Sequence, residues 1–548
     1  MRVSLAGKSE FRTVNRKPLG LCLNPSPYLK INVSSGGAPL PDEAFLNVTV
    51  SGVIRPDRSH WLAMITPSNS SVSGCPLNGL NFIQTGDLAS LPLLCHYPIK
   101  LARRVCINSS TLLIGFSCHL PHTNITLIIP VILSEISMMR LTWVSGDGKQ
   151  QQIQYGSGKN ATSVATTFTH KDMCSISVLP SPAKDFGWHD PGYIHSAVMA
   201  GLMPSQSYTY RYGSDSVGWS NTIKFRTPPA AGSGELNFVI FGDMGKAPLD
   251  PSVEHYIQPG STSVAKAVAT EMQTGNVDSI FHIGDISYAT GFLVEWDFFL
   301  HLITPLASQV SYMTAIGNHE RDYAGSGSVY PNLDSGGECG VAYESYFPMP
   351  SSSKDKPWYS IEQGSVHFVV MSTEHEFSEK SEQYNWMVED LPSVDRSRTP
   401  WLIFIGHRPM YSSNSGILPS VDPNFVASVE PVLLNNKVDL VFFGHVHNYE
   451  RTCAVYQCKC KGMPKKDAKG IDTYDNSNYT APVHVIVGAG RFSLDGFPKN
   501  KLASWSLSRI SEFGYARVHA TKTDMLIQFV NSNTMAVRDQ FRIVKGGR

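Results

Sequence analysis

Five short apolar segments between residues 236 and 444 of this chain each end in a glycine that is followed at once by a potential metal ligand. The pairs are Gly242-Asp243, Gly284-Asp285, Gly317-Asn318, Gly406-His407 and Gly444-His445, with His447 two residues after the last pair. A single Asp or His after a strand is more commonly the cap of a turn. Five repetitions, all with ligand-type side chains, instead predict one shared site at the carboxyl ends of parallel strands.

The apolar segments are typical of strands buried on both faces of an α/β domain. Helical spacing between them predicts two amphipathic crossover helices. The first presents Val264, Val268 and Met272, and the second presents Tyr384, Met387, Val388 and Leu391. Residues 514–532 alternate around a polar turn, which predicts an antiparallel hairpin at the edge of the sheet.

The length of 548 residues predicts two or three domains at about 150 residues each. Residues 22–135 are expected to form an N-terminal β-rich region, although 101–138 have no readable pattern and we assign them no structure. Short strands bounded by Gly, Ser and Pro predict a β sandwich over 136–230. A linker rich in Pro and Gly, 227–236, then leads into the α/β domain, 236–548.

Composition limits the function and the compartment. The 45 basic residues balance the 45 acidic ones, so nothing favours nucleic acid, and the most apolar run, 125–133, is too short to span a membrane. Ten cysteines and seven Asn-x-Ser/Thr acceptors favour a secreted or vacuolar glycoprotein with disulfides, with buried reduced thiols as the alternative. No signal-peptide core is visible in residues 1–30. The acceptors are Asn32, Asn47, Asn69, Asn108, Asn124, Asn160 and Asn478.

With Tyr288, which follows Asp285 by three residues, the blocks supply three His, two Asp, one Asn and one Tyr. That set exceeds what one metal ion needs and suits two. Two cations about 3.5–4 Å apart form a clamp for in-line phosphoryl displacement. A phenolate suits a trivalent ion, whereas Asn and neutral His suit a divalent one. The sequence therefore predicts an asymmetric dinuclear metal site.

The blocks GDMG, GDISYA, GNHE, GHRPMY and GHVHNYER resemble the five-block signature of the purple acid phosphatases, within the calcineurin-like metallophosphoesterases. The resemblance runs from about Met139 onward and implies two mixed sheets flanked by helices, behind a fibronectin-like β sandwich. The GHRPMYSS and STEHEF blocks resemble the nucleotide pyrophosphatase/phosphodiesterase-like members of the large plant type.

The resemblance also implies a role for each ligand. Asp243, Tyr288 and His447 would bind Fe(III), and Asp285 would bridge to the second ion. Asn318, His407 and His445 would hold a divalent Zn, Mn or Fe. The implied activity is an acid phosphatase that hydrolyses phosphate monoesters by attack of a metal-bound hydroxide, which is available even at acidic pH.

Two histidines are the candidates for contact with the substrate. His319 resembles the family histidine that contacts phosphate or protonates the leaving group, with a structural hydrogen bond to Glu320 as its alternative. The well-studied plant enzymes carry further histidines after the His407 block, and this chain has none there. His375 is the candidate replacement, with Glu374 and Tyr411 as weaker ones. Arg451 is expected to pair with a carboxylate.

Two other functions stay open at this point. One is a nucleotide pyrophosphatase/phosphodiesterase that uses the same site, and the other is a non-enzymatic glycoprotein with a structural metal site. The expected partners are a small phosphate ester or nucleotide, with no nucleic acid and no membrane, and a homo-oligomer is left open. The sequence does not determine the physiological ester, the divalent metal or the disulfide pairing.

Overall fold

A computed structural model describes residues 138–546 of the protein, apart from 178–180, 186, 246–258, 352, 415–419, 491–492 and 499–502. Before residue 138 it describes only the backbone of eight strands. These are β1 (Asn15–Arg16), β2 (Cys22–Leu23), β3 (Lys30–Val33), β4 (Phe45–Ser51), β5 (Trp61–Ile65), β6 (Leu93–Pro98), β7 (Leu112–Ser117) and β8 (Thr126–Pro130). Among the described helices, none is long and apolar enough to cross a bilayer.

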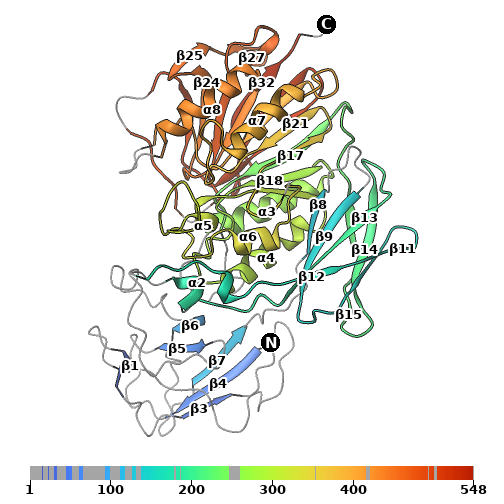
Figure 1. Ribbon diagram of the computed structural model, residues 1–548, viewed down its shortest axis with the longest axis vertical. Helices are drawn as coiled ribbons and strands as arrows, with labels where there is room; N and C mark the ends of the chain where they lie inside the picture. Colours follow the sequence, from blue (N-terminus) through green and yellow to red (C-terminus); the bar gives the residue numbers. More distant parts are fainter. Residues whose placement is uncertain are drawn as a thin grey trace.

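The first seven strands form small separate sheets, drawn in blue in Figure 1. β1 pairs with β2, β5 pairs with β6, and β3, β4 and β7 form a three-stranded sheet. Much of the expected β-rich region at 22–135 lies outside the described residues. Two strands, β7 and β8, lie within 101–138, where the sequence pattern supported no assignment.

A β sandwich follows, with its strands between residues 138 and 226 and β8 added to one sheet. Its further strands are β9 (Met138–Ser145), β10 (Gln152–Tyr155), β11 (Lys159–Thr162), β12 (Val164–Thr166), β13 (Tyr193–Ala200), β14 (Ser207–Ser214), β15 (Gly218–Trp219) and β16 (Ile223–Arg226). One sheet has the order β12-β13-β9-β8, and the other contains β11, β10, β14, β15 and β16. Alternate residues such as Leu141, Trp143 and Tyr210 fill the core between them.

Two large mixed sheets make up the α/β domain. The first contains β17 (Leu236–Phe241), β18 (Ser279–Ile283), β19 (Ser311–Ala315), β26 (Lys465–Lys466), β27 (Asp472–Asp475), β30 (Gly514–Ala520), β31 (Asp524–Asn531) and β32 (Val537–Val544). The second contains β20 (Tyr359–Gln363), β21 (Val366–Val370), β22 (Trp401–Ile405), β23 (Leu440–Phe443), β24 (Tyr449–Tyr456), β25 (Lys459–Gly462), β28 (Val483–Val487) and β29 (Ser506–Ile510). Their orders are β19-β18-β17-β30-β31-β32-β27-β26 and β20-β21-β22-β23-β28-β24-β25, with β29 paired to β24.

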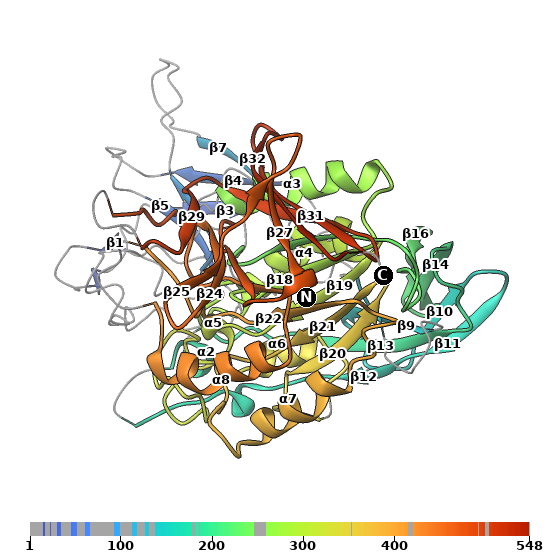
Figure 2. The ribbon, with the colours of Figure 1, turned by 90° about the horizontal axis from the view of Figure 1, so that it is seen from above.

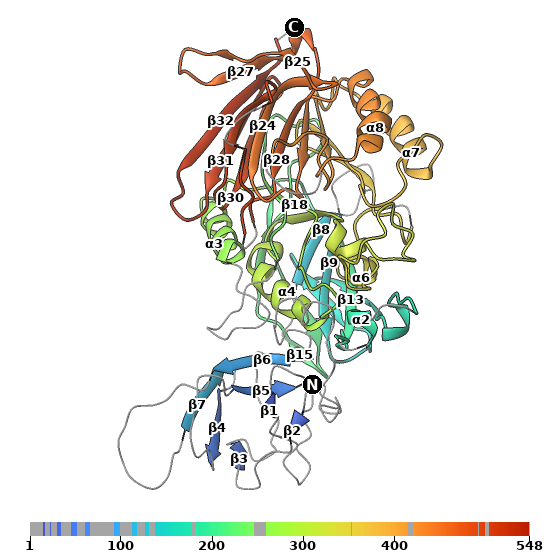
Figure 3. The same ribbon diagram turned by 90° about the vertical axis from the view of Figure 1, so that its left-hand side faces the viewer.

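The helices cover the outer faces of these sheets, as Figure 2 shows for α3 (Pro259–Gln273) on one side and α7 (Glu382–Ser393) and α8 (Pro423–Asn435) on the other. Shorter helices and α4 (Val294–Ala307) lie near the sandwich in Figure 3. The predicted crossover helices are thus confirmed as α3 and α7. Within α7, Met387 and Leu391 are buried, but Val388 is 44% exposed and lies outside the apolar stripe.

The predicted hairpin over residues 514–532 is confirmed as β30 and β31, but its expected place at the sheet edge is wrong. β30 pairs with β17, and β31 pairs with β32. The sheet continues through β32 to β27, a strand that precedes the hairpin in the chain by about 40 residues. Local alternation carries no information about such a distant partner.

Two disulfides join described cysteines, Cys174–Cys339 and Cys453–Cys460, while Cys458 is free and exposed. The expectation of disulfides is confirmed for these four residues. Cys453–Cys460 closes the β24–β25 hairpin, whereas Cys174–Cys339 joins the sandwich segment after β12 to the α/β domain. The side chains of Cys22, Cys75, Cys95, Cys106 and Cys118 lie outside the described part of the chain.

Candidate metal centre

The seven candidate ligands come from both large sheets. Asp243 and Asp285 follow β17 and β18, Asn318 begins the short helix α5 (Asn318–Arg321) after β19, and Tyr288 lies on the loop after β18. His407 follows β22, and His445 and His447 follow β23. The carboxyl ends of the parallel strands therefore meet between the sheets, where open α/β folds bind ligands.

The glycines before the ligands let these loops approach one another closely. A Cβ atom at Gly284 would lie 2.3 Å from Nδ1 of His407, and one at Gly444 would lie 2.5 Å from Oδ2 of Asp243. A Cβ atom at Gly317 would lie 2.5 Å from Oδ1 of Asp285. No larger residue fits at these positions without moving a ligand.

Four of the seven ligands adopt positive φ angles, which non-glycine residues rarely do. The angles are 57° at Asp243, 50° at Asp285, 52° at Tyr288 and 67° at His445. Each such conformation costs on the order of 1–3 kcal/mol and persists only where the surrounding structure holds it. Their concentration in one cluster marks a functional site.

The ligand atoms form two groups that share Asp285. In one, the Tyr288 hydroxyl lies 3.2 Å from Oδ1 of Asp243, 2.9 Å from Oδ2 of Asp285 and 3.1 Å from Nε2 of His447. In the other, Oδ1 of Asn318 lies 2.9 Å from Nε2 of His407 and 2.9 Å from Nδ1 of His445. Oδ1 of Asp285 lies 3.1 Å from Nε2 of His407. Asp285 thus has one carboxylate oxygen in each group.

Burial and charge make this cluster strongly polarised. Burial raises the pKa of Asp285, but His407 and His319 outweigh it and bring that pKa well below its ordinary value. Burial lowers the pKa of His407, but Asp285 raises it to about 10 overall. Burial and Arg408 hold the pKa of His445 well below its ordinary value. A positive charge bound between the buried carboxylates would therefore offset the free-energy cost of burying them.

Backbone and carboxyl groups around the ligands fix their orientation. Nδ1 of His407 lies 3.1 Å from the carbonyl oxygen of Ile283, so its Nε2 points into the cluster. The Glu320 carboxyl accepts from the N–H groups of Ile286 at 2.8 Å and Gly317 at 3.0 Å. The N–H of His447 donates to Oδ2 of Asp495 at 3.0 Å.

The donor set fits a pair of cations. Carboxylate, phenol, amide and imidazole atoms within hydrogen-bond distance of one another are N and O ligands suited to Fe, Zn or Mn. The groups Asp285, His407, His445 and Asp243, Asp285, His447 each offer ligand atoms within 4.8 Å of one another. Asp243, Tyr288 and His447 would hold one ion, Asn318, His407 and His445 would hold the other, and Asp285 would contact both.

Comparison with known proteins agrees with this geometry. Residues 236–449 match the family model of the calcineurin-like phosphoesterases, residues 131–227 match the purple acid phosphatase N-terminal domain, and residues 481–540 match the iron/zinc purple acid phosphatase-like protein C domain. "Probable inactive purple acid phosphatase 27" of Arabidopsis thaliana is 33% identical, over 96% of this chain and 91% of that protein. The chain belongs to the purple acid phosphatase family.

Two further relatives match this chain over most of their own length. The "nucleotide pyrophosphatase/phosphodiesterase" of Hordeum vulgare is 36% identical over 60% of this chain and 88% of that protein. The purple acid phosphatase from yellow lupin (Lupinus luteus) seeds has a TM-score of 0.82 and 29% identity, over 95% of this chain and 96% of that one. The predicted fold, a calcineurin-like metallophosphoesterase domain of two mixed sheets behind a β sandwich, is confirmed, and the sandwich region matches the purple acid phosphatase N-terminal domain.

His319 lies against the cluster. Its ring centroid is 4.3 Å from that of Tyr288, and its Nε2 lies 3.9 Å from Oδ2 of Asp285. Nδ1 lies 3.1 Å from the carbonyl oxygen of Asp334, whereas Glu320 accepts from backbone N–H groups. The ring is therefore close enough to meet a group bound between the ligands.

His375 bonds to groups other than the seven ligands. Its Nδ1 pairs with the Ser372 hydroxyl at 2.7 Å and its Nε2 with Oδ1 of Asp355 at 3.2 Å. The weaker candidates also have other partners, because Glu374 pairs with Arg408 and the Tyr411 hydroxyl bonds to Glu430.

Arg451 forms ion pairs with Asp472 at 2.9 Å and with Asp539 at 2.7 Å. Its expected pairing with a carboxylate is confirmed.

Arg408 is a residue that the sequence analysis missed. It follows His407 directly, and its Nη1 donates to Nε2 of His445 at 3.2 Å. Nη2 pairs with Asp322 at 2.8 Å and Nε with Glu374 at 2.9 Å. Burial and Glu374 raise the pKa of Asp322 to about 9. The sequence did indicate Arg408, because in the GHRPMY block this charged residue directly follows the ligand His407.

Proposed function

We propose that this chain is an active purple acid phosphatase that hydrolyses phosphate monoesters at acidic pH. The observation that carries the proposal is the convergence of all seven candidate ligands, with Oδ1 of Asn318 2.9 Å from both His407 and His445. An Fe(III) ion and a divalent Zn, Mn or Fe ion bound there would polarise the ester and supply a nucleophile from water.

The residues of the chain contribute binding, orientation and proton transfer. Asp285 is proposed to keep the two ions together, because its oxygens face different ligand groups. His319 is proposed to contact the phosphate or protonate the leaving group, since its ring lies 4.3 Å from that of Tyr288, centroid to centroid, at the border of the cluster. The proposal for His375 is weaker, since contact with substrate requires its ring to release the exposed Asp355.

A diester or pyrophosphate substrate is the second candidate, favoured by the similarity to the barley nucleotide pyrophosphatase/phosphodiesterase. Initial rates on p-nitrophenyl phosphate and on its bis ester, measured with the same enzyme preparation, separate the two. A higher kcat/KM on the monoester supports the first proposal, and the reverse order supports the second.

The non-enzymatic alternative is a glycoprotein with a structural metal site. A structural zinc site usually has four ligands and no open position, whereas seven ligands for two ions leave room for water and substrate. Asp285→Asn tests this directly. We expect loss of hydrolysis by at least about 100-fold with a native circular dichroism spectrum, whereas a wild-type protein without hydrolase activity on any of these esters would support the glycoprotein.

Export as a glycoprotein, to the outside of the cell or the vacuole, is also a proposal. Two disulfides among the described cysteines support an oxidising compartment, and the acceptor Asn160 is exposed on β11. A mobility shift after glycosidase treatment of the protein from its natural source would test it.

A further inference from the structure

Asn318 has to present its amide oxygen, not its nitrogen, to a cation. The amide can rotate by 180° and exchange the two atoms, so a neighbour must choose between them. Nδ2 of Asn318 donates to Oδ2 of Asp334 at 3.0 Å. An ionised carboxylate only accepts hydrogen bonds, so Asp334 can pair with the amide nitrogen of Asn318 but not with the amide oxygen. The oxygen is thereby directed toward His407 and His445.

The same residue also orients His319. The carbonyl oxygen of Asp334 lies 3.1 Å from Nδ1 of His319. A carbonyl oxygen accepts only, so the ring proton belongs on Nδ1 and the lone pair of a neutral ring belongs on Nε2. One residue therefore sets the orientation of a proposed ligand through its side chain and of a proposed catalytic histidine through its backbone.

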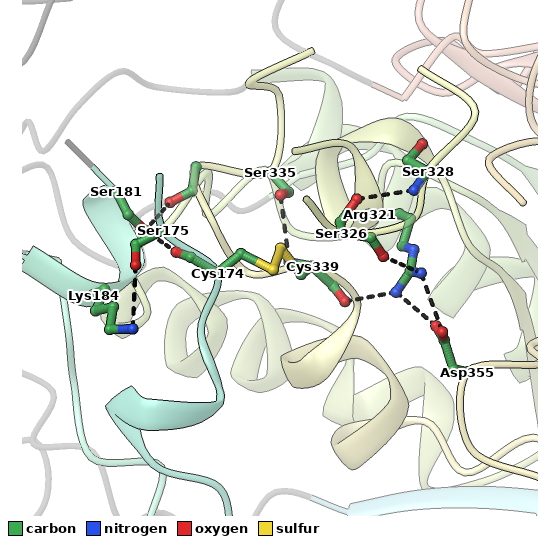
Figure 4. Close-up of a disulfide and its surroundings, with 11 residues drawn as sticks. Cys174, Ser175, Ser181, Lys184, Arg321, Ser326, Ser328, Ser335, Cys339 and Asp355 are labelled. Carbon is green, nitrogen blue, oxygen red and sulfur yellow. Dashed lines mark hydrogen bonds and ion pairs between the residues drawn. A yellow bond between two sulfur atoms is a disulfide. The ribbon is translucent and has the colours of Figure 1, made fainter. Parts of the chain in front are cut away.

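The loop that carries Asp334 is tied to the β-sandwich part of the chain. Figure 4 shows the disulfide between Cys174, from the segment after β12, and Cys339, at the end of this loop. The N–H of Cys339 donates to the Ser335 hydroxyl at 3.4 Å, and the N–H of Ser335 donates to the carbonyl oxygen of Asp322 at 3.0 Å. The disulfide is thus linked through one hydrogen bond to Ser335, which directly follows Asp334 in the chain.

Noncovalent contacts reinforce this tie. The N–H of Cys174 donates to the carbonyl oxygen of Gly337 at 2.9 Å, and the Ser181 hydroxyl donates to the carbonyl oxygen of Cys174 at 2.6 Å. On the other side, Nη1 of Arg321 donates to the carbonyl oxygen of Cys339 at 3.0 Å. The loop is therefore held between the sandwich segment and the residues that follow Asn318.

From these contacts we propose that Asp334 is a positioning residue for the divalent cation, and that the Cys174–Cys339 disulfide keeps its loop in place. The sandwich segment then contributes to metal binding without supplying a ligand. This inference rests on the proposed function, because it needs a chain that binds two cations. Groups around metal ligands typically change metal affinity about 10- to 100-fold when removed.

Metal titration of the apoprotein tests the role of Asp334. Wild type, Asp334→Ala and Asp334→Asn are stripped with chelator and titrated first with Fe(III) and then with Zn²⁺, by isothermal calorimetry. We expect Asp334→Ala to weaken Zn²⁺ binding about 10- to 100-fold and to leave the visible band of the iron site unchanged. Asp334→Asn should bind Zn²⁺ almost as wild type does, because its own amide oxygen can accept from Asn318.

Equal Zn²⁺ affinity in wild type and Asp334→Ala would overturn the inference while leaving the proposed function intact. A wild-type protein that binds no pair of cations would instead remove the proposed function. Melting curves of the apoproteins, recorded before titration, establish that each variant is folded at the temperature of the measurement.

The disulfide is tested with a matched pair. Cys174→Ser with Cys339→Ser should weaken Zn²⁺ binding several-fold and increase amide hydrogen exchange at residues 334–339. Cys453→Ser with Cys460→Ser removes a disulfide that closes its own hairpin, so it should leave Zn²⁺ affinity unchanged. If the first double variant does not fold, limited reduction of the folded wild-type protein replaces it. Equal effects of the two disulfides on Zn²⁺ affinity would overturn the role of the tether.

Discussion

Nη1 of Arg408 donates to Nε2 of His445 across 3.2 Å, while Nε of the same guanidinium pairs with Glu374 across 2.9 Å. The side chains of Glu374 and Asp322 are fully buried, and that of Arg408 is 12% exposed. A proposed metal ligand is therefore packed against a buried ion-pair network that the ligand pattern alone did not reveal.

Removal of Arg408 should destabilise the fold. Arg408→Ala leaves buried Glu374 without its partner, and breaking a buried ion pair in this way typically costs about 3–5 kcal/mol. We expect the free energy of unfolding in urea to fall by that amount. Arg538→Ala is the control, because Arg538 pairs with Glu512 at an exposed position, where such a pair contributes about 0–1 kcal/mol. Equal losses of unfolding free energy in Arg408→Ala and Arg538→Ala would contradict a stabilising role for the buried network.

A methyl group at Gly444 should disrupt the metal centre. The Cβ atom of Gly444→Ala would lie 2.5 Å from Oδ2 of Asp243 and 3.0 Å from the carbonyl oxygen of Ile283. We expect loss of metal and at least about 100-fold lower activity, measured by elemental analysis and ester hydrolysis. Gly234→Ala is the matched control, because no atom lies within 4 Å of its added methyl group. Full metal occupancy in Gly444→Ala would show that the loop can shift.

Tyr288 should determine the colour of the protein. Its hydroxyl lies within 3.2 Å of Asp243, Asp285 and His447, where a phenolate would contact a trivalent ion. We expect about one iron per chain and a purple band that Tyr288→Phe abolishes while the protein stays folded. Metal analysis with a visible spectrum checks both. A colourless, catalytically competent di-manganese protein would contradict the assignment.

His367 should make stability depend on pH. Burial lowers its pKa, but Asp390 at 3.2 Å and Glu362 at 3.3 Å raise it overall above the ordinary 6.5. The charged ring therefore stabilises the fold below about pH 6.5, and this contribution is lost as pH rises through the raised pKa. The hydrogen bond from His367 lowers the pKa of Glu362 below 4.5, so its contribution is present above pH 4.5 and lost in stronger acid.

The pair should thus stabilise the fold most between about pH 4.5 and 6.5. Urea unfolding at a series of pH values should show this maximum, and His367→Gln should flatten it. His519→Gln is the control, because His519 bonds to the neutral Asn237 at 2.8 Å. An unchanged pH profile in His367→Gln would refute the assignment.

The sequence alone sufficed for the ligand blocks and their strands. Each of the five apolar segments before the ligands became a buried strand, since continuous apolar runs bounded by glycine are suited to strands covered on both faces. The helices α3 and α7 were also predictable, because their periodicity is local. The positive φ angles at Asp243 and His445 were less predictable, because only the glycine before each ligand indicated a tight turn there.

Only the tertiary structure decided which distant residues meet. The insertion of β30 beside β17, the pairing of Asp334 with Asn318 and the contact of Arg408 with His445 join segments between 16 and 278 residues apart. Sequence periodicity reports which face of an element is buried, but it carries no information about its partner. The types of ligand were therefore readable from the chain, whereas the groups that orient them emerged only from the tertiary contacts between loops and strands.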